Sequence, residues 1–157
     1  DFEVLETPGH TPIHISLFGH SDEPHLLCGD TVFNAGVGHC HTGDPNVLYA
    51  TFRDKISKLP DATRIYPGHD YIANNLQFTL DREPNNADAK ALLADVEGQN
   101  PDDALVTTLG TERKVNTFMR LDSAGVIAGI KAKFSELPDN PTEEDVFLHL
   151  RLLRNDW

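Results

Sequence analysis

The stretch "LETPGHTPIHISLFG", residues 5–19, places a turn, a histidine and a strand-like run next to one another. Pro8 and Gly9 favour a change of chain direction. Apolar residues then recur at alternate positions over residues 13–18, which is the period of a β-strand. His10 lies at the entrance of this predicted strand, where an imidazole can be a turn residue, a surface group or a metal ligand. One histidine alone does not distinguish these roles.

Three further short runs have the composition of strands, at residues 2–5, 25–28 and 64–66. Between the last two runs, apolar residues from Val47 to Leu59 fall near helical spacing, and Pro60 ends the pattern. The order of strand, helix and strand predicts an α/β unit.

From about residue 72 onward, helical patterns dominate the sequence. They run over residues 72–82, 87–97, 123–134 and 142–155. Thr142, with Asp145 three positions later, indicates a helix N-terminus with an imperfect capping box. We therefore predict an α/β part over residues 1–80 and a helical part over residues 81–157.

The chain of 157 residues is acidic, with a formal net charge of −12 from 25 acidic and 13 basic side chains. Nucleic acids and anionic membranes are bound through basic patches, so this charge argues against both partners. Cys28 and Cys40 are too few for a disulfide framework, and no run approaches the roughly 18 apolar residues of a membrane span. We expect a cytoplasmic protein. Because Asp1 is not a methionine and leads directly into a strand, we also expect that residues preceding it have been removed.

Ligand-type residues stand at the ends of three predicted strands. His10 precedes one strand, Asp30 follows "LLCG", and His69 follows "RIYPG"; each has a glycine neighbour. Glycine lets backbones approach closely, and functional groups gather in loops at one edge of a sheet. Two imidazoles and a carboxylate suit Zn²⁺, Fe²⁺ or Mn²⁺. Spacing alone leaves open the alternative that each residue only shapes a turn or a cap.

Four motifs resemble the metallo-β-lactamase superfamily, namely "TPGHT" (7–11), "GDTVF" (29–33), "GVG" (36–38) and "YPGHDYIANNLQF" (66–78). Within the superfamily, "NTFMR" (116–120) and "LRLLRNDW" (150–157) are similar to the hydroxyacylglutathione hydrolases of the glyoxalase II type. The resemblance implies an α/β fold. Residues 1–80 would be the C-terminal half of a metallo-β-lactamase αββα sandwich, and residues 81–157 a helical substrate-binding domain.

The resemblance also implies roles for the three strand-end residues. His10 would ligate a first divalent metal ion and His69 a second, while Asp30 would bridge the two ions as the catalytic carboxylate. The ions would be zinc, or else iron or manganese. Because metal ions lower the pKa of bound water, the implied reaction is attack of hydroxide on the carbonyl of a small-molecule thioester of glutathione.

Positions that bind the glutathione part in the family can also be found here. Arg151 and Arg154 are three residues apart, hence on one helix face, and align with a cationic pair that contacts a substrate carboxylate. Tyr71 aligns with a substrate-contacting tyrosine. His39 stands where the family usually has Lys or Arg, and His41 where it often has an aromatic residue. We therefore expect this protein to bind glutathione more weakly than family members with Lys or Arg at the position of His39, and in a pH-dependent way.

The His-x-His-x-Asp-His motif, which supplies most of the other metal ligands in the superfamily, is absent from this sequence. We therefore expect a half-built sandwich with an exposed apolar sheet face. Such a chain needs the missing N-terminal half of the fold as a partner and is inactive alone. Two alternatives remain open: another metallo-β-lactamase-fold enzyme, such as an iron-dependent sulfur dioxygenase, or a non-catalytic binding module built on the half-fold.

Overall fold

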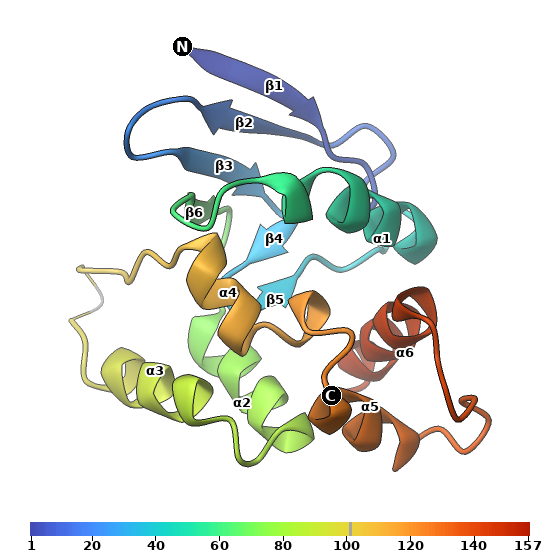
Figure 1. Ribbon diagram of the computed structural model, residues 1–157. Coiled ribbons are helices and arrows are strands. Elements are labelled where there is room, and N and C mark those ends of the chain that lie inside the picture. The colour runs from blue at the N-terminus through green and yellow to red at the C-terminus, as the bar shows by residue number, and fades with distance from the viewer. Residues whose placement is uncertain (101) are drawn as a thin grey trace.

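Four strands form a mixed sheet at one end of the molecule, in the spatial order β1-β2-β3-β6 (Figure 1). The computed structural model describes residues 1–100 and 102–157. The strands are β1 (Phe2–Glu6), β2 (Ile15–Gly19), β3 (His25–Gly29) and β6 (Arg64–Pro67). β1, β2 and β3 pair in antiparallel fashion, whereas β6 runs parallel to β3. The carboxyl ends of β3 and β6 therefore lie at the same edge of the sheet.

The two faces of this sheet differ in what covers them. One face is buried and carries Phe18, Leu26, Cys28 and Ile65. The opposite face is exposed although it is largely apolar, and its exposed members are Phe2, Val4, Ile15, Leu27 and Tyr66. The strand register places these five side chains on one common surface. The structure thus has the exposed apolar sheet face that the sequence predicts.

Helix α1 (Pro45–Asp54) adds apolar side chains to the core on the buried face of the sheet (Figure 1). It begins at Asp44, whose side chain accepts a hydrogen bond from a backbone N–H of the first turn. The sequence predicts one continuous helix up to Pro60, and this is wrong. The backbone leaves helical geometry at Lys55, and the separate 3-10 turn η1 (Ile56–Lys58) buries its first side chain in the core.

The remainder of the chain is mainly helical. Helices α2 (Ile72–Arg82) and α3 (Ala87–Glu97) have the predicted bounds. The later elements are α4 (Leu109–Val115), the 3-10 turn η2 (Thr117–Met119), α5 (Ala124–Lys131) and α6 (Glu143–Asn155). The sequence did not predict α4 or η2. None of the described helices is long and apolar enough to cross a membrane.

Two predicted helix ends have different outcomes. The predicted helix over residues 123–134 ends early, at Lys131, because the backbone N–H groups of Lys133 and Phe134 both turn back to the carbonyl of Ile130. At the start of α6 the capping box is confirmed. Thr142 Oγ1 accepts from the Asp145 backbone N–H at 3.1 Å, and Asp145 Oδ2 accepts from the Thr142 backbone N–H at 2.9 Å.

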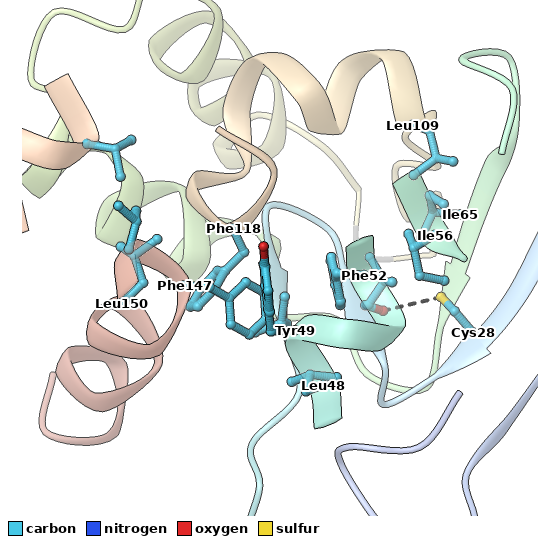
Figure 2. Packing of buried hydrophobic residues seen from close by; sticks show 14 of the residues in the cluster. Cys28, Leu48, Tyr49, Phe52, Ile56, Ile65, Leu109, Phe118, Phe147 and Leu150 are labelled. Carbon is cyan, nitrogen blue, oxygen red and sulfur yellow. Dashed lines mark hydrogen bonds between the residues drawn. The ribbon is translucent and has the colours of Figure 1, made fainter. Parts of the chain in front are cut away.

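The principal hydrophobic core is shared by the two parts of the chain. Tyr49 and Phe52 of α1 pack against Phe147 of α6, which also contacts Phe118 of η2 (Figure 2). These residues belong to the same cluster as the buried face of the sheet. The expected boundary at residue 80 lies within α2, so the α/β and helical parts meet through common packing and not through a linker.

A short hairpin that the sequence did not predict lies between the sheet and the helices, formed by β4 (Val32–Phe33) and β5 (Gly36–Val37) (Figure 1). At its turn, Ala35 has a φ of 58°. Its backbone N–H donates to Oε2 of Glu112 on α4 at 2.8 Å. Glu112 is completely buried, and burial raises the pKa of its carboxyl to about 7.

Truncation of the shared core should destabilise the whole chain. We expect Phe147→Ala to lower the free energy of unfolding by about 3–5 kcal/mol, because it leaves a cavity between α1, α6 and η2. Leu152→Ala on the same helix is the matched control: Leu152 is 52% exposed, and the expected change is within about 0.5 kcal/mol. Urea unfolding followed by circular dichroism measures both, and equal losses would contradict the shared core.

The buried carboxyl of Glu112 should make stability depend on pH. Its pKa is about 7 in the folded chain against an ordinary value of 4.5, so the folded state holds this proton more tightly than the unfolded state. Its contribution to stability is therefore fully present below pH 4.5 and is lost as the pH rises to about 7. Comparing the unfolding free energies of the unsubstituted chain and Glu112→Gln from pH 5 to pH 8 isolates this effect. A difference that does not change with pH would contradict it.

Candidate metal centre and substrate pocket

The three ligand-type residues at the predicted strand ends lie close together. His10 Nε2 is 3.4 Å from Asp30 Oδ2, and His69 Nε2 is 3.6 Å from the same oxygen. Asp30 follows β3 and His69 follows β6, whose parallel pairing brings both residues to one edge of the sheet. His10 reaches this edge from the loop that joins β1 and β2. The structure therefore places two imidazoles around one carboxylate.

The tautomer of His10 follows from its second hydrogen bond. Its Nδ1 lies 2.5 Å from the backbone carbonyl oxygen of His39, which can only accept, so Nδ1 carries the proton. In the neutral ring, Nε2 then has a free lone pair that faces the carboxylate of Asp30. Two acceptors that face each other leave room for a cation between them, and a carbonyl on the far nitrogen is the usual support of a metal-bound histidine.

His14 supports Asp30 from behind. The backbone N–H of Asp30 donates to His14 Nε2 at 3.3 Å, and His14 Nδ1 lies 3.0 Å from Thr7 Oγ1 and 2.9 Å from Thr31 Oγ1. Partial burial and the nearby His10 lower the pKa of His14, which favours the neutral ring. His14 thus helps to fix the backbone at Asp30.

Two glycines allow the close packing of this edge. A Cβ at Gly68 would lie 2.6 Å from Asp30 Oδ1, and a Cβ at Gly38 would lie 1.8 Å from the Asp30 backbone oxygen. Any side chain at either position would displace Asp30.

The three side chains do not enclose an ion by themselves. In residues 1–100 and 102–157, no group of three or more His, Cys, Asp or Glu side chains is arranged tightly enough to form a complete metal site. His10, Asp30 and His69 offer two ring nitrogens and one carboxylate, which suits part of a zinc, iron or manganese site. Further ligands would have to come from elsewhere.

The five residues predicted to bind substrate line one pocket of about 350 Å³. They are His39, His41, Tyr71, Arg151 and Arg154, and the lining also includes Phe33, Val37, Asn75, Asn155 and Trp157. The Tyr71 ring stacks on the ring of His69, with centroids 5.3 Å apart. Tyr71 of the pocket thus contacts the metal-ligand candidate His69.

The two arginines of α6, expected together on one helix face, differ in their burial. Arg151 is buried, its Nη1 donates to the carbonyl oxygens of Val37 and Gly38, and burial lowers its pKa to about 10. It holds the chain beneath the pocket. Arg154 is less buried, and its guanidinium lies over the ring of Trp157 at 5.2 Å. Arg154 is therefore the more accessible cation.

His39 and His41 form one wall of the pocket. Their rings stack with centroids 3.5 Å apart. Burial lowers the pKa of His39, and the positive charge of Arg151 lowers it further. The sequence did not identify Asn75 or Trp157 as pocket residues. A possible signal was helical spacing, because Asn75 lies one turn after Tyr71.

Known proteins resemble this chain in sequence over nearly its whole length. Residues 70–157 match the family model described as the hydroxyacylglutathione hydrolase C-terminus. A hydroxyacylglutathione hydrolase of Nitrosococcus oceani is 56% identical over 156 residues, which cover 99% of this chain and 59% of that protein. One of Polaromonas sp. is 54% identical over 158 residues, which cover 100% of this chain and 60% of that protein.

Solved structures support the predicted fold class. A metallo-β-lactamase from Staphylococcus aureus superposes with a TM-score of 0.51 at 22% identity, covering 97% of this chain and 38% of that one. The B3 metallo-β-lactamase BLEG-1 superposes with a TM-score of 0.50 at 25% identity, covering 75% of this chain and 41% of that one. The α/β fold of the metallo-β-lactamase type is therefore confirmed.

The chain spans about three fifths of the length of the curated relatives that it matches. The family model covers more than half of the chain; it begins directly after His69 and includes Tyr71, Arg151 and Arg154. The chain belongs to the hydroxyacylglutathione hydrolase family.

Proposed function

We propose that this chain contributes the C-terminal part of a metal-dependent hydrolase that cleaves hydroxyacyl thioesters of glutathione. The observation that carries the proposal is the pair of imidazole nitrogens, His10 Nε2 and His69 Nε2, on either side of Asp30 Oδ2. With the Nδ1 proton donated to the His39 carbonyl, the neutral His10 ring directs its Nε2 lone pair towards a carboxylate oxygen at 3.4 Å, an arrangement that a cation between the two atoms would stabilise.

His10, Asp30 and His69 would contribute ligands to two divalent ions. Zinc fits this donor set best, and iron or manganese are the alternatives. Bound ions of this kind supply polarisation of a carbonyl and activation of water. In the hydrolysis, water adds to the acyl carbon, the carbon–sulfur bond breaks, and the proton left over goes to the thiolate. The products are a hydroxy acid and glutathione.

The pocket beside the metal ligands would hold the glutathione part. Glutathione carries two carboxylates, and the acidic chain attracts such an anion only where cations gather locally. Arg154 is the accessible cation of the pocket, and Arg151 adds positive charge from beneath. His39 and His41 would offer ring N–H groups. Tyr71, stacked on His69, would lie between the peptide part and the reacting carbonyl.

The remaining ligands would come from the N-terminal half of the fold. Its place is the exposed apolar sheet face of Phe2, Val4, Ile15, Leu27 and Tyr66, which an isolated soluble domain would normally cover. In this proposal the chain alone lacks activity because each ion is short of ligands, not because the residues described here are misplaced.

Complementation tests the proposed function. The preceding part of the Nitrosococcus oceani relative, added to this chain with Zn²⁺ as a separate or fused polypeptide, should yield hydrolysis of a hydroxyacyl thioester of glutathione. Release of free thiol measures the rate. Asp30→Ala should lower the rate at least about 100-fold, because the shared carboxylate is lost. The exposed Asp95→Ala on α3 should stay within about twofold. Thiol release no faster than with zinc alone, in both formats, would refute the proposal.

Gly68→Ala tests the metal ligands without removing one. The new Cβ would lie 2.6 Å from Asp30 Oδ1, so the carboxylate must move. We expect zinc affinity to fall about 10-fold or more, as for other changes that reorient ligands. Zinc titration of the imidazole nitrogen resonances in ¹⁵N NMR spectra measures it. Gly98→Ala is the matched control, since its Cβ would have 3.6 Å to its nearest neighbour. Equal zinc affinities of the two variants would count against Asp30 as a ligand.

A further inference from the structure

The β4–β5 hairpin connects two residues of the proposed metal centre. One is Asp30 itself, and the other is His39, whose backbone carbonyl orients the ring of His10. Asp30 precedes the hairpin, and the carbonyl of His39, which accepts the proton of His10 Nδ1 at 2.5 Å, follows it. The hairpin is closed at its base by the Gly38 backbone N–H, which donates to the carbonyl of Thr31 at 3.3 Å. A shift of this hairpin would therefore move both Asp30 and the support of His10.

The helical part of the chain holds this hairpin at its turn. Glu112 Oε2 accepts from the backbone N–H of Ala35 at 2.8 Å and from Asn116 Nδ2 at 2.9 Å. Asn116 Nδ2 also donates to the carbonyl oxygen of Gly36 at 3.1 Å. On the other oxygen, Thr107 Oγ1 donates to Glu112 Oε1 at 2.6 Å. One buried carboxylate thus fixes the single non-glycine residue among the described ones with a positive φ, Ala35.

A second contact from the helical part holds the exit of the hairpin. Arg151 Nη1 donates to the carbonyl oxygens of Val37 and Gly38 at 3.3 Å and 3.1 Å. The hairpin is therefore fastened at its turn by α4 and at its exit by α6. Gly38 packs directly on the backbone of Asp30, where a Cβ would lie 1.8 Å from the carbonyl oxygen. Because the hairpin packs against Asp30 without a gap, a displacement of the hairpin would move Asp30 as well.

Burial of a carboxylate is costly, and an apolar side chain of similar volume often serves stability as well. An apolar side chain at position 112 would, however, leave the donors of Ala35, Asn116 and Thr107 without this acceptor. An acceptor is required there because the Ala35 N–H, turned inward by its positive φ, has to be satisfied. Glu112 lies on α4, away from the metal ligands. Its connection to them runs through the β4–β5 hairpin, whose turn residue Ala35 it binds.

We infer that Glu112 is a positioning residue for the metal centre: through the β4–β5 hairpin it sets the place of Asp30 and of the His39 carbonyl that orients His10. This inference rests on the proposed metal-binding function. In this arrangement the helical part contributes to metal binding as well as to the substrate pocket, although it supplies no metal ligand among the described residues.

Zinc titration of this chain joined to the preceding part of the Nitrosococcus oceani relative, followed through the imidazole nitrogen resonances of His10 and His69, tests the inference without an activity assay. Glu112→Ala should weaken zinc binding about 10-fold or more, the range observed when support of a ligand is lost. Glu112→Gln keeps one oxygen for the Ala35 N–H and should recover most of the affinity. Should Glu112→Ala fail to fold, Asn116→Ala, which removes the donor to Gly36, should weaken zinc binding in the same direction.

Glu83→Ala is the matched control, because it removes a second glutamate that is also buried in the helical part. The described hydrogen-bond partners of Glu83 are Arg120, Ser123 and Asn86, none of which belongs to the hairpin. This variant should lose stability but keep zinc affinity within about twofold. Equal zinc affinities for Glu112→Ala and Glu83→Ala, with zinc binding at His10 and His69 intact in the unsubstituted joined protein, would overturn the inference alone. No response of the His10 and His69 resonances to zinc in the unsubstituted joined protein would overturn the proposed metal site and the inference with it.

Discussion

The structure depends on the convergence of two imidazole nitrogens on one carboxylate oxygen. His10 and His69 belong to loops about 60 residues apart in the sequence, and only the pairing of their strands with β3 brings them to Asp30. Two ring nitrogens and a carboxylate oxygen that converge in this way form part of a donor set for a divalent cation. The glycines at positions 38 and 68, which leave no room for a side chain, are explained by the same convergence.

Much of this edge could be predicted from the sequence, because each residue carried a local signal. Glycine neighbours and strand ends pointed to His10, Asp30 and His69, and family motifs pointed to the pocket. How deeply each side chain is buried could not be predicted in this way. Arg151 and Arg154 have the same spacing signal, yet Arg151 is buried beneath β5 and Arg154 is not. Burial depends on which segment packs over the helix, and helical period carries no information on that segment.

The elements missed in the sequence have a common physical cause. The β4 and β5 strands have two residues each, too few for a period of two to appear, and their turn is fixed by distant contacts with Glu112 and Asn116. Helix α4 has seven residues and also escapes a periodicity analysis. The sequence likewise placed a boundary at residue 80, where composition changes, whereas Phe147 and Phe52 pack across it. Long-range contacts, absent from any local pattern, hold both the hairpin and the shared core.

The most direct measurement of the central claim is anomalous X-ray scattering at the zinc edge, from crystals of this chain joined to the preceding part of its relative and grown with Zn²⁺. The account predicts zinc peaks at about 2.0–2.2 Å from His10 Nε2, His69 Nε2 and an oxygen of Asp30. Zinc peaks only at other residues, with these three side chains free of metal, would contradict it.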